Sequence, residues 1–239
     1  MSFVDKLLRL YFDLVYNATY DLTTAQSTTY RGFQKRCIDK FGFEEGDSIL
    51  CVGIGTGNEI IYILDGNKEI EISGVDTSER ALRRAYRKGL QHGRDIQVLR
   101  MDAQNLKYPA ETFNKVLCCH VMDFINDDGR ATREIIRVLK RNGQFVITYP
   151  SGKEGIKLGL TLLKDSIPNK NGLGKFVRIL SQLLVRMGAA ILYLPLLLRT
   201  KKRFYSRQDL EAMFIELKPV DVQIEEYAVY NDFIVYGRK

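Results

Sequence analysis

Residues that bind transition metals or form disulfides are few in this chain of 239 residues. It has two histidines, His92 and His120, four cysteines and no tryptophan. Two histidines do not make a histidine-rich metal site, and the cysteines show no CxxC spacing, which argues against a zinc finger or a disulfide framework. We therefore expect no bound metal and a reducing, cytoplasmic setting.

The chain also lacks an apolar run long enough to cross a membrane. Its first residues show no basic region followed by a clean apolar stretch, so we expect no secretory signal. The uncharged stretch Met187–Leu198 is shorter than the about 20 residues of a membrane-spanning helix, and Pro195 interrupts it. Hydrophobic residues (45%) and charged residues (27%) occur in globular proportions, which predicts a folded domain.

Short apolar runs alternate with amphipathic helical patterns from residue 48 onward. The predicted strands are Ser48–Val52, Glu69–Val75, Ile96–Met101, Lys115–Cys119 and Gln144–Tyr149. The predicted helices are Asn58–Leu64, Ser78–Gln91 with Ser78 as its N-cap, and Asp128–Lys140, which a turn at Asn142–Gly143 follows. Such alternation favours a parallel sheet with helices on both faces.

The two ends of the chain depart from this alternation. Helical patterns cover Phe3–Val15 and about 30–41 at the N-terminal end. A helix at Ser206–Leu217 precedes two strand-like runs, Val220–Val229 and Asp232–Tyr236. Only two residues separate these runs, which permits a hairpin and excludes a crossover helix. We therefore expect the sheet to end in an antiparallel strand.

Three glycines at alternate positions follow the first predicted strand. Gly53, Gly55 and Gly57 lie where the chain must turn tightly, and glycine lets a backbone approach a ligand closely. The helix that follows offers free N–H groups to an anionic group. The dinucleotide pattern GxGxxG and the phosphate-binding GKS/T are both absent. The alternative is a glycine-rich turn without a ligand.

Acidic residues close the next two strands. Asp76 ends the second strand at the spacing from the glycines at which an acid accepts hydrogen bonds from ribose hydroxyls. Asp102 ends the third strand, where it can accept from an exocyclic amine while the next N–H meets a ring nitrogen. For both residues the alternative is a helix-capping or turn-capping carboxylate.

With these motifs, residues of about 45–150 resemble class I S-adenosylmethionine-dependent methyltransferases, in particular the branch of the ubiquinone, menaquinone and lipid enzymes. The resemblance implies an α/β fold with a Rossmann-like seven-stranded sheet, an antiparallel last strand, helices on both faces and a helical cap or insertion. It implies S-adenosylmethionine as cofactor and S-adenosylhomocysteine as product.

The same resemblance assigns roles to individual residues. The three glycines would pass beneath the methionine part of the cofactor and Asp76 would hold the ribose. Asp102 and Ala103 would frame the adenine, and Thr77 and Cys119 are further cofactor-binding candidates. One position departs from the family pattern, because Cys51 stands where an acid usually orders the loop and the cofactor's amino end. Glu59 is the residue that could substitute for it.

His120 is the candidate general base, because it follows the fourth strand, which in the resembling family lies beside the sulfonium. An unperturbed pKa of about 6.5 suits proton removal near neutrality. The alternative is a histidine that lines the pocket or bonds to the backbone. Neither Asn/Asp-Pro-Pro-Tyr nor a Pro-Cys nucleophile follows this strand, which disfavours methylation of nucleic-acid bases.

Positive charge is concentrated in residues 151–207, which hold twelve Lys or Arg and two acidic residues, whereas the whole chain has a net charge of +7. We favour a membrane-surface element, whose apolar side chains enter the interface while its basic side chains meet anionic headgroups. A helical lid over the core is the main alternative, and nucleic-acid binding fits less well because of the long aliphatic runs.

These observations predict a single methyltransferase domain. It comprises an N-terminal helical cap (1–42), a cofactor-binding core (43–150), a basic and apolar helical insertion (151–205), and a closing helix and hairpin (206–239). The expected function is methyl transfer to a hydrophobic or lipid-like acceptor (a quinone, isoprenoid or phospholipid) at the inner face of a membrane. A soluble methyltransferase of a polar metabolite and a non-catalytic cofactor-binding module are the alternatives.

Overall fold

The structure is a computed structural model that describes residues 27–64, 69–152, 204–229 and 231–239. The chain divides into two units, residues 33–154 with 201–239 and residues 1–32 with 155–200, and the account below concerns the first. The predicted helix Phe3–Val15 and nearly all of the predicted insertion 151–205 lie outside the described residues. The division into cap and core therefore stays a prediction.

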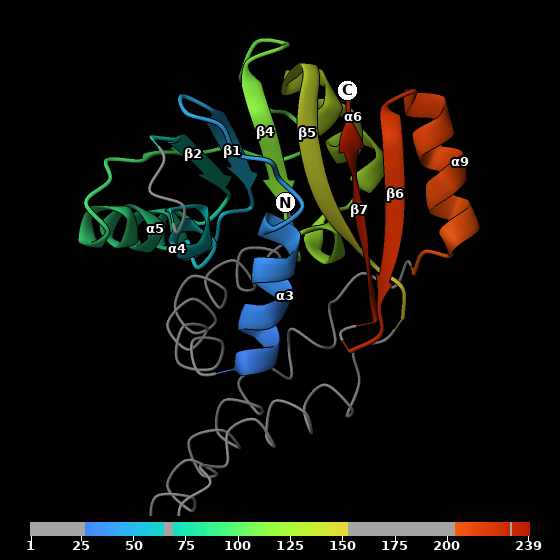
Figure 1. Cartoon of the computed structure of the whole chain (residues 1–239), viewed down its shortest axis with the longest axis horizontal. Coiled ribbons are helices and arrows are strands. Elements are labelled where there is room, and N and C mark those ends of the chain that lie inside the picture. Colours follow the sequence, from blue (N-terminus) through green and yellow to red (C-terminus); the bar gives the residue numbers. More distant parts are fainter. Residues whose placement is uncertain (1–26, 65–68, 153–203, 230) are drawn as a thin grey trace, which may run out of the picture. The chain divides into compact units, whose positions relative to one another are not determined.

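Within the described residues, seven strands form one sheet in the order β3-β2-β1-β4-β5-β7-β6 (Figure 1). Strands β1 to β5 pair in parallel, and β7 runs antiparallel to both of its neighbours, β5 and β6. This confirms the predicted fold class. The strands are β1 (Ser48–Val52), β2 (Glu71–Asp76), β3 (Gln97–Arg100), β4 (Phe113–Cys118), β5 (Leu139–Pro150), β6 (Val220–Tyr227) and β7 (Asp232–Arg238).

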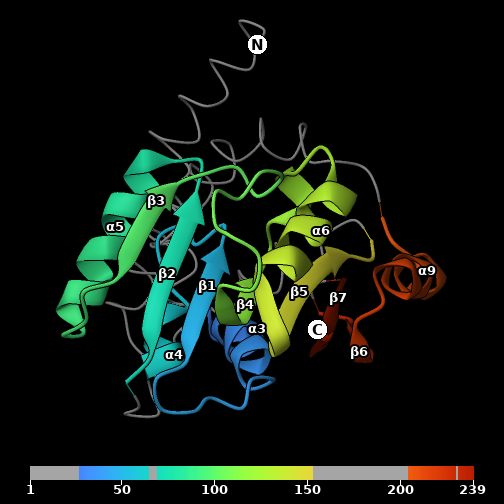
Figure 2. The same cartoon turned by 90° about the horizontal axis from the view of Figure 1, so that it is seen from above.

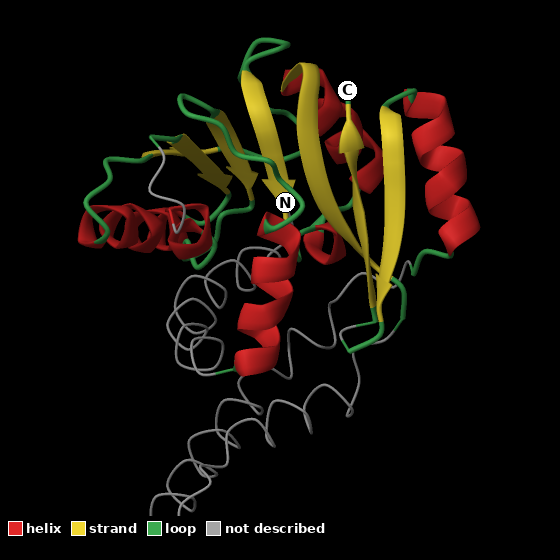
Figure 3. Cartoon of the chain, viewed as in Figure 1, coloured by secondary structure: helices red, strands yellow, loops and turns green. Residues whose placement is uncertain are grey.

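Two of the helices drawn in red in Figure 3, α5 and α9, begin at serine N-caps. The Ser78 side chain accepts a hydrogen bond from the Ala81 N–H, which confirms it as the N-cap of α5. Ser206 and Asp209 form a reciprocal capping box at the start of α9. The described helices are α3 (Thr28–Ile38), α4 (Ile60–Ile63), α5 (Glu79–Gln91), α6 (Asp128–Val138) and α9 (Arg207–Leu217), with a 3-10 turn, η3 (Met122–Phe124).

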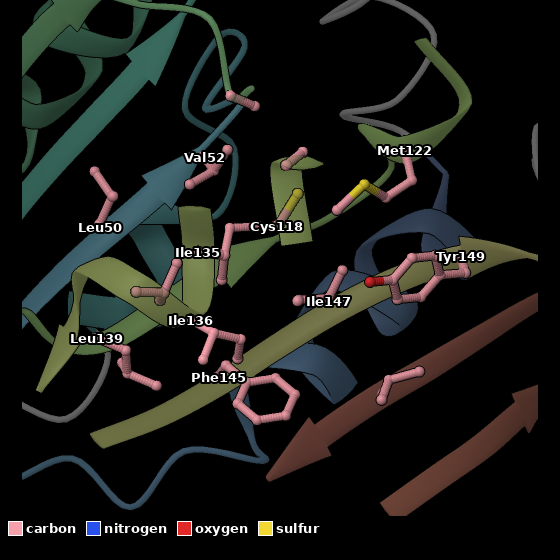
Figure 4. Close-up of a cluster of buried hydrophobic side chains, with 14 of the residues drawn as sticks. Leu50, Val52, Cys118, Met122, Ile135, Ile136, Leu139, Phe145, Ile147 and Tyr149 are labelled. Atoms are coloured by element: carbon pink, nitrogen blue, oxygen red, sulfur yellow. The ribbon is translucent and has the colours of Figure 1, made fainter. Parts of the chain in front are cut away.

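The two faces of the sheet carry different sets of side chains, because successive residues of a strand point to opposite faces. Leu50 and Val52 of β1 belong to a hydrophobic core together with α6 and α9. Figure 4 shows part of this core, including Cys118 of β4 and Ile147 of β5. Residues 33–38 of α3 and helix α6 lie on opposite sides of β4 and β5 (Figure 2).

Three polar contacts hold the C-terminal part of α3 and the residues after it. Gln34 Nε2 donates to Glu59 Oε1 at 2.8 Å. Lys40 Nζ lies 2.6 Å from Glu225 Oε2, and Arg36 pairs with the same carboxylate on β6. These contacts fix Phe33 of α3 against the ring of His120, with 4.6 Å between the ring centroids.

The predicted turn at Asn142–Gly143 is wrong. Helix α6 ends at Val138, and β5 begins directly at Leu139, so both residues of the pair lie within the strand. The pairing of β5 with β4 shifts register between Leu139 and Gln144, and Asn142 has a φ of 61°. The two residues that favour a turn therefore form a bulge inside a strand. A bulge, like a turn, can require a residue with left-handed backbone.

Arg137 and Glu134 of α6 anchor the connection that follows β3. Arg137 donates to the carbonyl oxygens of Leu106 and Tyr108, each at 2.9 Å, and the Glu134 carboxylate accepts from the Leu106 N–H. Hydrogen bonding from Arg137 lowers the pKa of Glu134, although burial opposes this shift. The segment that carries Asp102 and Ala103 is thereby tied to a helix of the core.

Replacement of Glu134 by glutamine tests this anchor. Glu134→Gln should lower the free energy of unfolding by about 1–2 kcal/mol at pH 7, because hydrogen bonds to an ionised group are lost. Since the folded pKa is depressed below the unfolded value near 4.5, the stabilisation is present above that value and is lost as the pH falls through the folded pKa. Urea titrations of both proteins from pH 7 to pH 3 should show the two stabilities converging.

Candidate functional site

The predicted site residues come together at one edge of the sheet. Val52, at the end of β1, pairs with Val75 of β2 and Cys118 of β4, and Asp76 pairs with Arg100 at the end of β3. The residues that follow these four strands therefore share the carboxyl edge. Ligands of open α/β sheets bind at this edge.

The loop after β1 adopts a conformation that favours glycine. Gly53, Gly55 and Gly57 have φ values of 68°, 53° and 78°. A Cβ at Gly53 would lie 2.3 Å from the Val121 side chain, and one at Gly57 would lie 3.0 Å from the Ala85 backbone. At Gly55 the nearest atom would be 3.9 Å away. The outer glycines thus serve close packing, whereas Gly55 leaves open space beside the backbone.

Asp76 binds the loop to the start of α5. Its Oδ2 accepts from the Gly55 N–H at 3.0 Å, and its Oδ1 accepts from the Ser78 N–H at 2.8 Å. A carboxylate has about four lone-pair positions, so these bonds leave capacity for ligand hydroxyls. Asp76 therefore acts as a capping carboxylate, which was the alternative interpretation. This does not prevent it from binding ribose, and that role stays a prediction.

The residues after β2 and β3 differ in exposure. Thr77 and Asp102 are exposed, and the Thr77 carbonyl accepts from Arg100 Nε at 3.1 Å. Asp102 Oδ1 accepts from the Gln104 N–H at 2.9 Å, which is a turn-capping bond. Ala103 is buried in the hydrophobic core. The prediction that Asp102 and Ala103 border the adenine therefore stays a prediction.

His120 has a strained backbone just beyond β4. Its φ is 54°, uncommon for a residue with a side chain, and its N–H donates to Thr148 Oγ1 at 2.8 Å. Its Nδ1 lies 3.1 Å from Asp232 Oδ2. A strained residue beside a buried carboxylate is typical of functional sites.

Asp232 is a residue that the sequence did not single out. It is the first residue of β7, is 1% exposed, and pairs across the sheet with Pro150 of β5. In the sequence it reads as the start of an apolar strand. The sequence holds one sign of its importance: Asp232 is a charged residue in a strand that lies between two others and is buried on both sides.

Cys51, in β1, and Cys119, directly after β4, are buried thiols near the carboxyl edge of the sheet. A hydrogen bond with Cys37 of α3, together with burial, raises the pKa of Cys119 well above its ordinary value. Burial is the larger cause of the raised pKa of Cys51, and the nearby charge of Glu59 adds to it. Both side chains are therefore neutral thiols near pH 7, and neither is suited to act as a nucleophile.

In the residues that the structure describes, no cluster of three His, Cys, Asp or Glu side chains is arranged to hold a metal ion. No described helix has the length and apolar character to cross a membrane.

The features of this edge fit a nucleoside with a charged amino-acid tail. The space beside Gly55 would be filled by a Cβ and admits a ligand against the backbone. The Asp76 carboxylate lies next to it, and the buried Glu59 carboxyl follows the loop directly. Helix α4 spans only Ile60–Ile63, so a helix dipole contributes little here.

Comparison with known proteins identifies relatives of this chain. A family described as "Methyltransferase domain" matches residues 50–147. The protein named "Putative methyltransferase YrhH" of Bacillus subtilis is 34% identical over 132 residues, which are 54% of this chain and 72% of that protein. Phosphatidylethanolamine N-methyltransferase of Cereibacter sphaeroides is 32% identical over 105 residues, which are 43% of this chain and only half of that enzyme.

Solved structures share the fold at low sequence identity. Phosphoethanolamine N-methyltransferase 2 of Haemonchus contortus, determined with phosphomonomethylethanolamine and S-adenosylhomocysteine, superposes with a TM-score of 0.65 at 14% identity. The match covers 97% of this chain and 60% of that one. This likeness establishes the fold alone.

Two glycine variants separate ligand binding from backbone strain. Gly55→Ala should lower the affinity for S-adenosylhomocysteine by about tenfold or more, because the new methyl group enters the space beside the loop. Gly46→Ala is the matched control, since Gly46 also has a positive φ (78°) and open surroundings but precedes β1. Each variant should lose about 1 kcal/mol of stability.

Isothermal titration calorimetry measures the affinity and urea unfolding measures the stability. Equal affinities in the two variants would contradict the placement of the ligand beside Gly55.

Proposed function

Since this chain belongs to the S-adenosylmethionine-dependent methyltransferases, we propose that it methylates a hydrophobic, lipid-like acceptor at a membrane surface. When bound, the cofactor supplies a methyl group on a positively charged sulfur, which an acceptor atom attacks in line. The task of the protein is then to hold both partners in alignment and to keep water out.

The observation that carries the acceptor class is the composition of residues 151–207. Twelve basic and two acidic residues flank an uncharged stretch, Met187–Leu198. This combination suits an anionic interface, where each basic side chain contributes about 1 kcal/mol. The relative named phosphatidylethanolamine N-methyltransferase supports a lipid acceptor.

We assign the cofactor to the carboxyl edge of the sheet. Gly53, Gly55 and Gly57 let the backbone pass close to its methionine part, and Asp76 accepts hydrogen bonds from its ribose. Asp102 and Ala103 border the adenine. Thr77 and Cys119 complete the candidate set, Thr77 from the exposed end of β2 and Cys119 from the buried end of β4.

His120 is positioned to remove the proton that the acceptor atom loses. Asp232 Oδ2, 3.1 Å from Nδ1 of the ring, favours the tautomer whose proton lies on Nδ1. Nε2, which is buried in this structure, would then hold the lone pair that takes a proton from an acceptor O–H or N–H. Asp232 acts through His120 and is a positioning residue.

The acceptor class is tested by transfer of labelled methyl groups. The purified protein is incubated with methyl-labelled S-adenosylmethionine and a cell extract, which is then separated into organic, aqueous small-molecule and macromolecular fractions. We expect the label in the organic fraction. Label confined to the other fractions would contradict a lipid-like acceptor and leave the methyltransferase activity intact.

The membrane surface is examined separately, by co-sedimentation with vesicles at low salt. Vesicles of phosphatidylcholine with phosphatidylglycerol should carry the protein down, whereas vesicles of phosphatidylcholine alone should not. The binding should weaken as salt is added, because it depends on charge. A protein that stays in the supernatant with both kinds of vesicle is a soluble enzyme.

The role of the His120–Asp232 pair is tested with two variants. His120→Asn keeps a residue type that tolerates the left-handed backbone and should lower kcat by about 10²-fold or more. Asp232→Asn should lower kcat by about tenfold without changing KM, because it removes only the group that orients the ring. Both should bind S-adenosylhomocysteine as the wild type does, measured by calorimetry. An unchanged kcat in His120→Asn would show that His120 is not the base.

A further inference from the structure

A second concentration of positive charge lies within the described part of the chain, on α5 and β3. Residues 79–100 hold seven Lys or Arg and two acidic residues, which gives a net charge of +5. The chain outside residues 151–207, by contrast, has a net charge of −3. The basic character is therefore a property of this segment and does not follow from the composition of the rest of the chain.

Helix α5 separates its buried residues from its basic residues. It lies beside β2 and β3, at the end of the sheet opposite α9 (Figure 2). Its buried residues are Ala81, Leu82, Ala85 and Gly89. Because residues three, four or seven positions apart lie on one face of a helix, Arg80, Arg83 and Arg87 form a row along the middle of the opposite, exposed face.

Two large apolar side chains lie along one side of this row. Tyr86 is 37% exposed and Leu90 is 50% exposed. Each follows an arginine of the row by three positions, so both lie next to the row and on the same side of it. We call Arg80, Arg83, Tyr86, Arg87 and Leu90 the α5 face. It combines cationic and apolar groups on a surface that points away from the sheet.

The arginines of the α5 face are only weakly engaged within the protein. Arg83 Nη2 lies 3.7 Å from Glu79 Oε2, and the two side chains are 67% and 64% exposed, so water screens this pair. Among the described residues, no acidic side chain pairs with Arg80 or Arg87. The guanidinium groups therefore retain their capacity to bind anions outside the protein.

An anionic lipid surface fits this combination better than a nucleic acid does. Guanidinium groups bind phosphate in either partner, so the arginines alone do not distinguish the two. The exposed apolar side chains do, because an aliphatic side chain and an amphipathic ring both suit the boundary between headgroups and acyl chains. A nucleic-acid surface stacks successive bases on several aromatic side chains, and the α5 face has one.

We propose that the α5 face docks the protein on an anionic membrane surface, with its arginines on the headgroup phosphates and Leu90 in the interface. The proposal rests on the proposed function in its choice of a membrane as partner, but it involves none of residues 151–207. Helix α5 starts at the carboxyl edge of the sheet, where Asp76 Oδ1 accepts from the Ser78 N–H. Docking by this helix therefore ties the cofactor edge to the surface.

Vesicle co-sedimentation with two triple variants locates the charges that bind. Arg80→Gln/Arg83→Gln/Arg87→Gln removes three charges from the α5 face and keeps residues that form helices well. With vesicles of phosphatidylcholine and phosphatidylglycerol, its partition coefficient should be about 100-fold lower than that of the wild type. Urea unfolding of each variant verifies that it folds.

The matched control is Arg130→Gln/Arg133→Gln/Arg141→Gln. It removes the same number of charges from exposed positions on α6 and β5. Its partition coefficient should stay within about twofold of the wild-type value, because salt screens charges that lie far from the bound surface.

The chain contains no tryptophan, which allows a second, independent measurement. Leu90→Trp places a single fluorophore on the α5 face, and Ile215→Trp places one on α9, where Ile215 is 76% exposed. The emission of Leu90→Trp should shift to shorter wavelength when anionic vesicles are added, because the indole leaves water for the interface. The emission of Ile215→Trp should not change.

Three results would overturn the proposal. One is an equal loss of partitioning in both triple variants, which would show dependence on net charge alone. The second is co-sedimentation of Leu90→Trp without a shift of its emission, which would place the binding on another surface. The third is that the α5 triple variant loses binding to poly(U) RNA and keeps binding to vesicles, which would assign the face to nucleic acid.

Failure of the docking proposal is distinguishable from failure of the proposed function. If the α5 triple variant partitions like the wild type while the methyl label enters the organic fraction, docking through α5 is wrong and the lipid-like acceptor stands. If this variant loses partitioning while the label stays in the aqueous fraction, the docking surface stands and the acceptor class is wrong. A wild-type protein that binds neither kind of vesicle also overturns docking.

Discussion

The bond between the Asp76 carboxylate and the Gly55 N–H is the contact on which the site depends. It joins the loop after β1 to the end of β2, and the other oxygen of the same carboxylate holds the N–H of Ser78 at the start of α5. Three left-handed residues in one loop are costly for any residue except glycine. One side chain thus fixes a loop that has little regular structure of its own, and it fixes the direction in which the next helix leaves the sheet.

The sequence predicts this part of the molecule well because its signals are local. β1 was predicted with its observed bounds, Ser78 was predicted as a cap, and the hairpin spacing predicted the antiparallel β7. The turn at Asn142–Gly143 was wrong, since a preference for left-handed backbone does not distinguish a turn from a bulge. Asp232 was missed because its partner, His120, is distant in sequence and adjacent only across the folded sheet.

The charged groups of the described residues fall into two classes with different tasks. Glu134 and Glu225 have basic partners and lowered pKa values, so they join helices and loops to the sheet. Glu59 and Asp232 are buried and have no ion pair with Lys or Arg among the described residues: the Gln34 amide donates to Glu59, and His120 Nδ1 lies 3.1 Å from Asp232 Oδ2. A carboxylate that a basic side chain already neutralises gains little from a ligand, whereas one held by a neutral amide retains its attraction for a cation. The difference separates structural acids from candidate binding acids.

The placement of β7 between β5 and β6 determines when the site can be completed during synthesis. Chain order puts β6 before β7, yet β6 reaches the sheet only through β7. The glycine loop and Asp76 are neighbours in sequence and can associate early, because closing a short loop costs little entropy. Asp232 reaches His120 only after β7 has emerged from the ribosome. A nascent chain can therefore bring the glycine loop and Asp76 together before β7 places Asp232 beside His120.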